Sequence, residues 1–213
     1  FCPEKDKCKI IRSSAVGSGV VFLSSKEDNK SYILTASHVC FEKPKQENLE
    51  KINSYTFEIY VRNYNNKIKE ARAVQINVDI PKEPDLCILE VSDLFLPRVA
   101  MATVAPRVGQ NVYSMSAPGG IYHPPVVPIF SGIYSGEIPA SQEEGSFPNS
   151  ALVTIPSIGG SSGSAVLNEN MEIVGVIFAS ALKMKNISLV TKYKDTLNFI
   201  KTFKKSGIKN PIF

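Results

Sequence analysis

The sequence lacks several features that would place it in other protein classes. No apolar run approaches the roughly 20 residues of a membrane-spanning helix, and there is no internal repeat or low-complexity tract. The net charge of +4 is spread in short clusters, such as Lys201, Lys204 and Lys205, without the basic stripe and aromatic partners of a nucleic-acid-binding surface. We therefore expect no membrane span and no nucleic-acid partner.

Histidine and cysteine are also scarce, with two and four residues respectively. Their spacings match no common zinc pattern, so we expect no metal and no cofactor. Four cysteines allow three full pairings. Cys2 and Cys8 lie in a polar N-terminal arm and could bridge each other, whereas Cys40 and Cys87 fall in apolar segments, where we expect both as buried free thiols.

The sequence begins at Phe1 rather than Met and shows no signal peptide. We interpret it as a processed or trimmed product whose compartment signal is missing. Its 213 residues, 43% of them hydrophobic, are enough for one large all-β domain or two small lobes.

Short apolar segments separated by Asn, Lys, Glu and Pro predict a β-rich chain. Breakers at Pro97 and Pro106 make residues 92–106 a plausible crossing between two lobes, 1–100 and 101–213. Leu197, Ile200 and Phe203 recur every three residues and predict an amphipathic helix over 192–204. The expected strands are 16–23, 32–35, 56–62, 68–78 and 86–91 in the first lobe and 111–117, 126–137, 151–155, 164–168, 172–179 and 187–191 in the second.

The run from Pro156 to Val166 is the most informative motif, because three glycines surround a pair of serines ahead of an apolar segment. Glycine reaches backbone angles that a Cβ forbids. Such a loop can aim consecutive N–H groups at one point and expose a hydroxyl there. Acyl-transfer enzymes need that combination, a nucleophile beside a hole for the oxyanion.

Two further segments strengthen this interpretation. An apolar strand runs from Ile33 into a turn that carries His38, and Asp85 opens another apolar strand. Asp85 follows His38 by 47 residues (85 − 38), and Ser162 follows Asp85 by 77 (162 − 85). A histidine can take the serine proton, and an aspartate can hold the imidazole in the required tautomer.

One alternative fails on chain order. Residues 159–163 also fit the G-x-S-x-G pattern of α/β-hydrolases, with Ser161 as nucleophile. In that fold the histidine follows the serine, whereas His38 and His123 both precede it. We interpret His123 as an ordinary loop residue.

With these residues in place, the chain resembles the trypsin/chymotrypsin superfamily over roughly residues 16–203. It is closest to the HtrA-like and viral-type branches, which lack activation by a new N-terminus. Ser161 and Ser164 depart from the family's Gly-Asn-Ser-Gly-Gly. The resemblance is carried by residues 33–38, 85–91 and 160–164, with lesser matches at 112–120 and 171–177.

The resemblance implies an all-β, chymotrypsin-like fold of two six-stranded antiparallel β-barrels with a C-terminal helix. The barrel over 1–100 would carry His38 and Asp85, and the barrel over 101–213 would carry Ser162. Together they form one protease domain. The implied activity is that of a serine endopeptidase, with an oxyanion hole at Gly160, Ser161 and Ser162.

The resemblance also suggests how a protein or peptide substrate would bind. Ser161 stands where relatives carry the acid that captures a new N-terminal ammonium, so no such activation is expected. No acid stands at the pocket base, so an uncharged, small or medium P1 residue is expected. Substrate backbone would pair along 178–180. The pocket base is expected at Pro156 and Ser157, and its walls at Phe178, Ala179, Ser180 and Ser188.

A second interpretation is a catalytically inactive, protease-like binding scaffold, because a fold does not guarantee activity. For the active enzyme, the sequence favours a secreted or periplasmic protein or a viral polyprotein product over a free cytoplasmic one. It carries no signal for the natural substrate or the oligomeric state.

Overall fold

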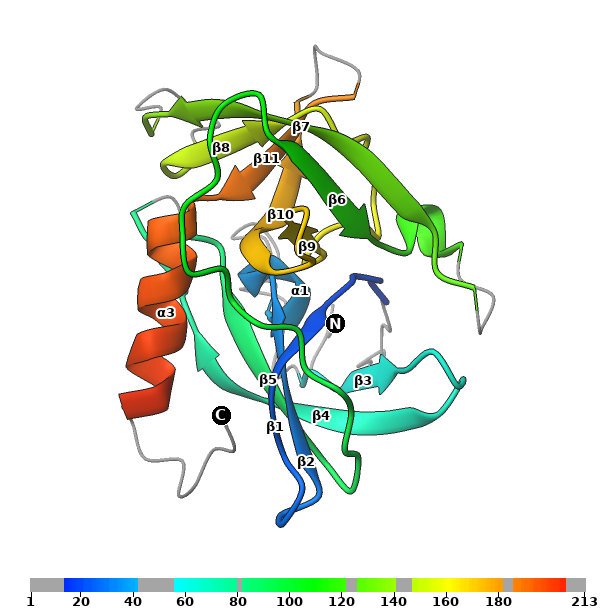
Figure 1. Ribbon diagram of the computed structural model, residues 1–213. Coiled ribbons are helices and arrows are strands. Elements are labelled where there is room, and N and C mark those ends of the chain that lie inside the picture. The colour runs from blue at the N-terminus through cyan, green and yellow to red at the C-terminus, as the bar shows by residue number, and fades with distance from the viewer. Residues whose placement is uncertain are drawn as a thin grey trace, which may run out of the picture.

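Eleven strands form two antiparallel sheets in the computed structural model of the chain. The structure describes residues 14–41, 56–79, 82–121, 126–140, 147–181 and 186–205. The barrel of the second lobe lies above the sheet of the first, with a short helix between them (Figure 1). Each of the eleven apolar segments found in the sequence holds one strand. Cys2, Cys8 and His123 lie outside the described residues.

The first sheet has five strands in the order β1-β2-β5-β4-β3 and is not closed, so the expected six-stranded first barrel is not what the described residues form. The apolar pattern itself contains only five strands there, and the sixth rested on the family resemblance. Residues 16–19, which were expected to extend β1, instead reach the other lobe, where Ser18 N donates to Ser162 O at 2.7 Å. The strands are β1 (Val20–Ser25), β2 (Lys30–Thr35), β3 (Ile59–Arg62), β4 (Ile68–Ile76) and β5 (Cys87–Ser92).

The second sheet closes into the expected six-stranded barrel, in the order β10-β11-β8-β7-β6-β9. Its central strand β10 is buried along most of its length, as its apolar sequence requires. The pairing of β10 with β11 shifts register between Ile177 and Ala179, near the end of β10. The strands are β6 (Asn111–Met115), β7 (Ile129–Ile138), β8 (Ser150–Val153), β9 (Ala165–Leu167), β10 (Ile173–Ser180) and β11 (Ser188–Thr191).

Helix α3 (Tyr193–Lys205) packs against both lobes (Figure 1). Phe199, Ile200 and Phe203 belong to one core cluster with residues of β1, β2 and β10. The sequence placed this helix correctly, and two of its three apolar residues, Ile200 and Phe203, are buried, whereas Leu197 is only half-buried. Two short helices lie near the site, α1 (Ser37–Cys40) and the 3-10 turn η1 (Pro118–Gly120).

The division of the chain at residue 100 stays a prediction. The first sheet ends with β5 at Ser92, and the barrel begins with β6 at Asn111. One core cluster contains residues of both lobes and of α3. The two lobes therefore share a continuous core.

Candidate active site

His38 and Asp85 come from neighbouring strands of the first sheet. β2 pairs with β5, with Thr35 opposite Cys87, so the turn after β2 meets the loop before β5. His38 Nδ1 lies 2.6 Å from Asp85 Oδ2, and His38 N donates to Asp85 Oδ1 at 3.1 Å. The carboxylate is buried, with 8% of its side chain exposed, whereas the imidazole is 46% exposed. A carboxylate acceptor places the proton on Nδ1, which makes Nε2 the basic nitrogen.

The loop that carries Asp85 is held on both sides by Asn77, at the end of β4. Asn77 Nδ2 donates to Pro84 O at 2.8 Å, and Asn77 N donates to Leu86 O at 3.1 Å. Asn77 O accepts a short hydrogen bond from the Ser37 hydroxyl. One residue therefore fixes the chain next to both members of the His38–Asp85 pair. Sequence reasoning missed Asn77, and nothing in its neighbourhood signals this role.

Cys40 and Cys87 are joined by a disulfide, so the prediction of two free thiols is wrong. Their burial was predicted correctly, at 5% and 0% exposed. The physical reason lies in the pairing of β2 with β5. Cys40 and Cys87 each stand two residues after a member of the hydrogen-bonded pair, and both pairs are 47 residues apart in sequence. The bridge therefore ties together the two segments that carry His38 and Asp85.

The serines between β8 and β9 differ in their accessibility. Ser161 and Ser164 are buried, at 1% and 0% exposed. Ser164 Oγ donates to Ser161 O at 2.6 Å, and Ser161 Oγ accepts from Ile158 N at 3.3 Å. Ser162 is only half-buried and sits between Gly160 and Gly163, both at positive φ of 95° and 89°. Of these three serines, Ser162 alone is not fully buried.

The N–H groups of the same loop are divided in a similar way. Ser161 N donates to Ile158 O at 2.9 Å, so this predicted oxyanion donor is already used inside the loop. Gly163 N and Ser164 N donate to Ile177 O and Ser161 O. The N–H groups of Gly160 and Ser162 donate to no acceptor within the described part of the chain. They remain as the two candidate donors for an oxyanion.

Close backbone contacts bring the Ser162 loop against the His38 segment. A Cβ on Gly163 would lie 2.1 Å from Thr35 Oγ1 and 3.1 Å from Ala36 N. A Cβ on Gly17 would lie 2.5 Å from Val39 and 3.2 Å from Ser162 O. Thr35 and Ala36, just before His38, therefore pack against the Ser162 loop at Gly163. Val39, just after His38, packs against Gly17, which in turn contacts Ser162 O.

The predicted specificity residues lie beside this loop but are unequally accessible. Ser188 is fully buried, and its hydroxyl donates to Ile155 O at 2.6 Å. Because its single proton is used there, the 2.6 Å contact with Ser157 Oγ makes Ser157 the donor. Pro156 is exposed. Ser188 can reach a substrate only through Ser157.

The expected substrate-binding edge is the end of β10. Phe178 is buried at 7% exposed, whereas Ala179 is half-buried and Ser180 is exposed. β11 occupies one side of this stretch, with Ala179 opposite Leu189 and Ser180 opposite Ser188. On the other side Ile177 N and O already bond to Ser164 O and Gly163 N. The strand edge beyond Ile177 borders the Ser162 loop.

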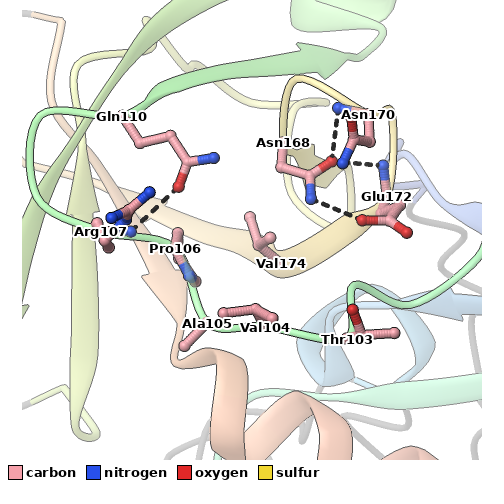
Figure 2. Close-up of a pocket in the computed structure, with 10 residues that line it drawn as sticks. All are labelled: Thr103, Val104, Ala105, Pro106, Arg107, Gln110, Asn168, Asn170, Glu172 and Val174. Carbon is pink, nitrogen blue, oxygen red and sulfur yellow. Dashed lines mark hydrogen bonds between the residues drawn. The ribbon is translucent and has the colours of Figure 1, made fainter.

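A cavity of about 270 Å³ lies elsewhere, between the segment that joins the lobes and the turn from β9 to β10 (Figure 2). None of the predicted site residues lines it. Its polar groups already bond to each other: Asn168 Nδ2 donates to Glu172 Oε2 at 2.8 Å, and Arg107 N donates to Gln110 Oε1 at 3.1 Å. These two bonds hold the rim of the cavity, and none of the residues proposed for catalysis contributes to it.

No three His, Cys, Asp or Glu residues in the described part of the chain gather in a group that could hold a metal ion. Within the same part of the chain, no helix has the length and apolar character to cross a membrane.

Comparison with known proteins supports this architecture. A family model described as a trypsin-like peptidase domain matches residues 17–176. The active form of the Rv3671c protease from M. tuberculosis is 19% identical, with a TM-score of 0.65 over 92% of this chain and 76% of that one. The serine endoprotease from Yersinia pestis is 21% identical, with a TM-score of 0.65 over 93% of this chain and 61% of that one.

The HtrA-type protease AlgW, solved with a decapeptide, is 18% identical, with a TM-score of 0.67 over 90% of this chain and 52% of that one. At such identities the likeness shows a shared chymotrypsin-like fold. A search of curated proteins returned no match.

Proposed function

The chain belongs to the trypsin-like peptidase domain family and is a serine endopeptidase, and we propose that Ser162, His38 and Asp85 are its catalytic triad. The observation that carries the assignment is the double contact of His38 with the buried Asp85, beside a loop in which Ser162, unlike Ser161 and Ser164, is only half-buried. Asp85 then accepts from Nδ1, and Nε2 serves as the base.

In the proposed reaction, Nε2 of His38 takes the proton of the Ser162 hydroxyl as Oγ attacks the scissile carbonyl. The carbonyl oxygen becomes an oxyanion, which the N–H groups of Gly160 and Ser162 stabilise. The tetrahedral intermediate collapses, the peptide C–N bond breaks, and His38 gives its proton to the leaving amine. Water, deprotonated by the same histidine, then hydrolyses the acyl-enzyme and restores Ser162.

Substrate is proposed to bind as an added strand along 178–180, with its P1 side chain directed toward Pro156 and Ser157. Uncharged hydroxyls and a proline offer no partner to a basic side chain. We therefore propose a preference for small or medium uncharged P1 residues. Because the substrate groups bound here are backbone amides, this mode suits extended segments of protein chains.

The Cys40–Cys87 bridge also favours a compartment. Structural disulfides form and persist in oxidising surroundings such as the periplasm or the cell exterior. We propose that the enzyme works there after export.

The triad is tested by labelling the full chain with a biotinylated fluorophosphonate, which reacts with an activated serine. We expect one label on Ser162, no label on Ser162→Ala, and peptide hydrolysis lost to the same extent. Ser161→Ala is the matched control, because Ser161 is the adjacent serine and is buried. It should still label, with partial loss of rate because the loop that borders the hole loses the bond from Ile158 N to the Ser161 hydroxyl.

Two outcomes would overturn the proposal. A folded wild-type chain that neither labels nor cleaves any member of a mixed peptide library is an inactive scaffold. A label on Ser161, with activity kept in Ser162→Ala, reverses the assignment of the nucleophile.

A further inference from the structure

Ser18, in the segment just before β1, uses every polar group it has to join three parts of the site. Its N–H donates to Ser162 O at 2.7 Å, and its carbonyl accepts from Thr35 Oγ1 at 2.7 Å. Its hydroxyl donates to Gly160 O at 2.8 Å and accepts from Ala117 N at 3.0 Å. Ser18 therefore contacts the nucleophile loop, the strand that leads to His38, and the segment after β6.

The bond to Gly160 matters because of where Gly160 lies. Its N–H is one of the two proposed oxyanion donors, and its φ of 95° belongs to a region that glycine enters readily. Glycine also leaves that region readily, so nothing in the residue itself keeps its N–H aimed at the substrate. Contacts from outside the loop must fix the two peptide planes on either side of Gly160.

Both planes are fixed in the structure. Gly159 O, which shares a planar peptide with the Gly160 N–H, accepts from Gly119 N at 2.6 Å. Gly160 O, in the next peptide, accepts from the Ser18 hydroxyl. The first bond is backbone to backbone and survives any side-chain change at these positions. The second peptide is also held from inside the loop, where Ser161 N donates to Ile158 O, but its one bond from outside the loop depends on the identity of residue 18.

Packing also restricts movement of the Ser162 loop toward residues 117–120. A Cβ on Gly160 would lie 2.3 Å from Ala117 O, so the loop is pressed against residues 117–120. The Ser18 hydroxyl joins the two parts of this contact, since it bonds to Ala117 N and to Gly160 O together. Removing the hydroxyl therefore leaves both an unpaired N–H and an unpaired carbonyl at the edge of the proposed hole.

We propose that Ser18 is a positioning residue, whose hydroxyl holds the Gly160 N–H in line for the oxyanion. The inference rests on the proposed function, because it assigns Gly160 to the hole. Ser18 does not touch the reacting atoms. The loss of its hydroxyl should lower the rate of acyl transfer while leaving substrate binding largely intact.

The test compares Ser18→Ala with Ser25→Ala, a matched control in β1. Ser25 also has a bonded hydroxyl, donating to Asp28 at 2.8 Å, but lies at the far end of the strand. Removing an oxyanion donor outright costs about 10²–10³ in kcat, so a loosened donor should cost about 10-fold or more. We expect that loss in kcat for Ser18→Ala, with KM within about threefold of wild type, as for an interaction made only in the transition state.

A peptide aldehyde gives a second readout, because its adduct with Ser162 places an oxygen in the hole. Its affinity should fall with kcat in Ser18→Ala and stay at the wild-type value in Ser25→Ala. Ser18→Thr keeps the hydroxyl and should recover most of the rate. Should Ser18→Ala fail to fold, Ser18→Cys, with its weak S–H donor, carries the same comparison at nearly the same size.

A folded Ser18→Ala with kcat and aldehyde affinity equal to those of Ser25→Ala overturns the inference. A loss seen only in thermal stability, or only in KM, overturns it as well. These results differ from failure of the proposed function, in which the wild-type chain itself does not react with fluorophosphonate.

Discussion

The serines around the site differ in what their hydroxyl groups contact, although the sequence presents them alike. Ser164 caps the carbonyl of Ser161 from a buried position. Ser18 and Ser188 bond to backbone carbonyls of other segments, Gly160 and Ile155. Ser162 is only half-buried. At the residue scale, therefore, role is set by tertiary hydrogen bonds rather than by residue type.

The proposed specificity pocket yields a prediction about the P1 residue. Its proposed base is Pro156, which carries no acid, and the hydroxyls proposed beside it, those of Ser157 and Ser188, carry no charge. Burying a P1 Lys or Arg there leaves an unpaired cation, which costs several kcal/mol even after relaxation. A mixed peptide library should therefore be cut mainly after small or medium uncharged residues.

Pro156→Asp should add a partner for a basic P1, and Pro156→Asn is the matched neutral control, with the same loss of proline. A hydrogen bond to a charged group contributes about 1.5–3 kcal/mol, so kcat/KM for Lys or Arg at P1 should rise about tenfold or more in Asp over Asn. Cleavage by the wild-type enzyme mainly after Lys or Arg would show that the pocket has been assigned to the wrong residues.

At the scale of elements, α3 packs against both lobes. Phe203 is 5% exposed, and its ring centroid lies 5.9 Å from Phe22 and 5.3 Å from Tyr32, both edge-on. The same cluster includes Ile173 and Val176 of the barrel. The apolar face of the helix therefore packs against both sheets.

Phe203→Ala should lower the free energy of unfolding by about 3–5 kcal/mol, the usual cost of truncating a buried aromatic residue. Urea unfolding followed by circular dichroism measures it. Lys201→Ala, exposed on the same helix, is the control and should change the free energy by about 0.5 kcal/mol or less. Equal effects of the two substitutions would mean that α3 does not bind the lobes together.

The elements were largely predictable from the sequence, because alternation and apolar runs are local signals. Strand β5 and its leading Asp85 needed only residues 85–91 to be recognised. The closure of a sheet is not a local signal, and the six-stranded first barrel, expected from the family resemblance, is not formed by the described residues of the first lobe. Contacts between residues far apart in the sequence were missed for the same reason. The Cys40–Cys87 bridge was missed although its 47-residue separation equals that of His38 and Asp85.

For the site, the sequence indicated the three residues proposed as the triad, but it did not indicate the residues that position them. Gly17 and Gly19 flank Ser18, a visible hint of close packing, yet only the fold shows that Ser18 meets Gly160. Asn77 has no such hint, because its partners come from three separate segments.

At the scale of the whole molecule, each lobe buries one tyrosine against a carboxylate. In the first sheet, burial and then the charge of Glu90 raise the pKa of Tyr32 to about 12. In the barrel, burial and then Glu137, whose Oε1 lies 3.2 Å from the phenol oxygen, raise the pKa of Tyr134 well above its ordinary value. Both lobes therefore favour the neutral phenol.

This arrangement predicts how stability changes at high pH. Below about pH 10, the ordinary pKa of tyrosine, both groups are neutral in the folded and the unfolded chain, and their contribution is fully present. As the pH rises further, the unfolded chain loses these protons while the folded chain keeps them. The free energy of unfolding should then fall by about 1.4 kcal/mol per pH unit for each tyrosine, over a window that ends near pH 12 for Tyr32.

Tyr32→Phe and Tyr134→Phe separate the two lobes in this prediction. Urea unfolding between pH 8 and pH 11 should show the gap between wild type and each variant constant up to about pH 10 and then shifting in favour of the variant, by about 1.4 kcal/mol per pH unit. Because the two tyrosines lie in different sheets, the shifts should add in the double variant. A gap that stays constant to pH 11 in both single variants would mean that neither phenol is held neutral by the fold, and a shift in only one would confine the effect to that lobe.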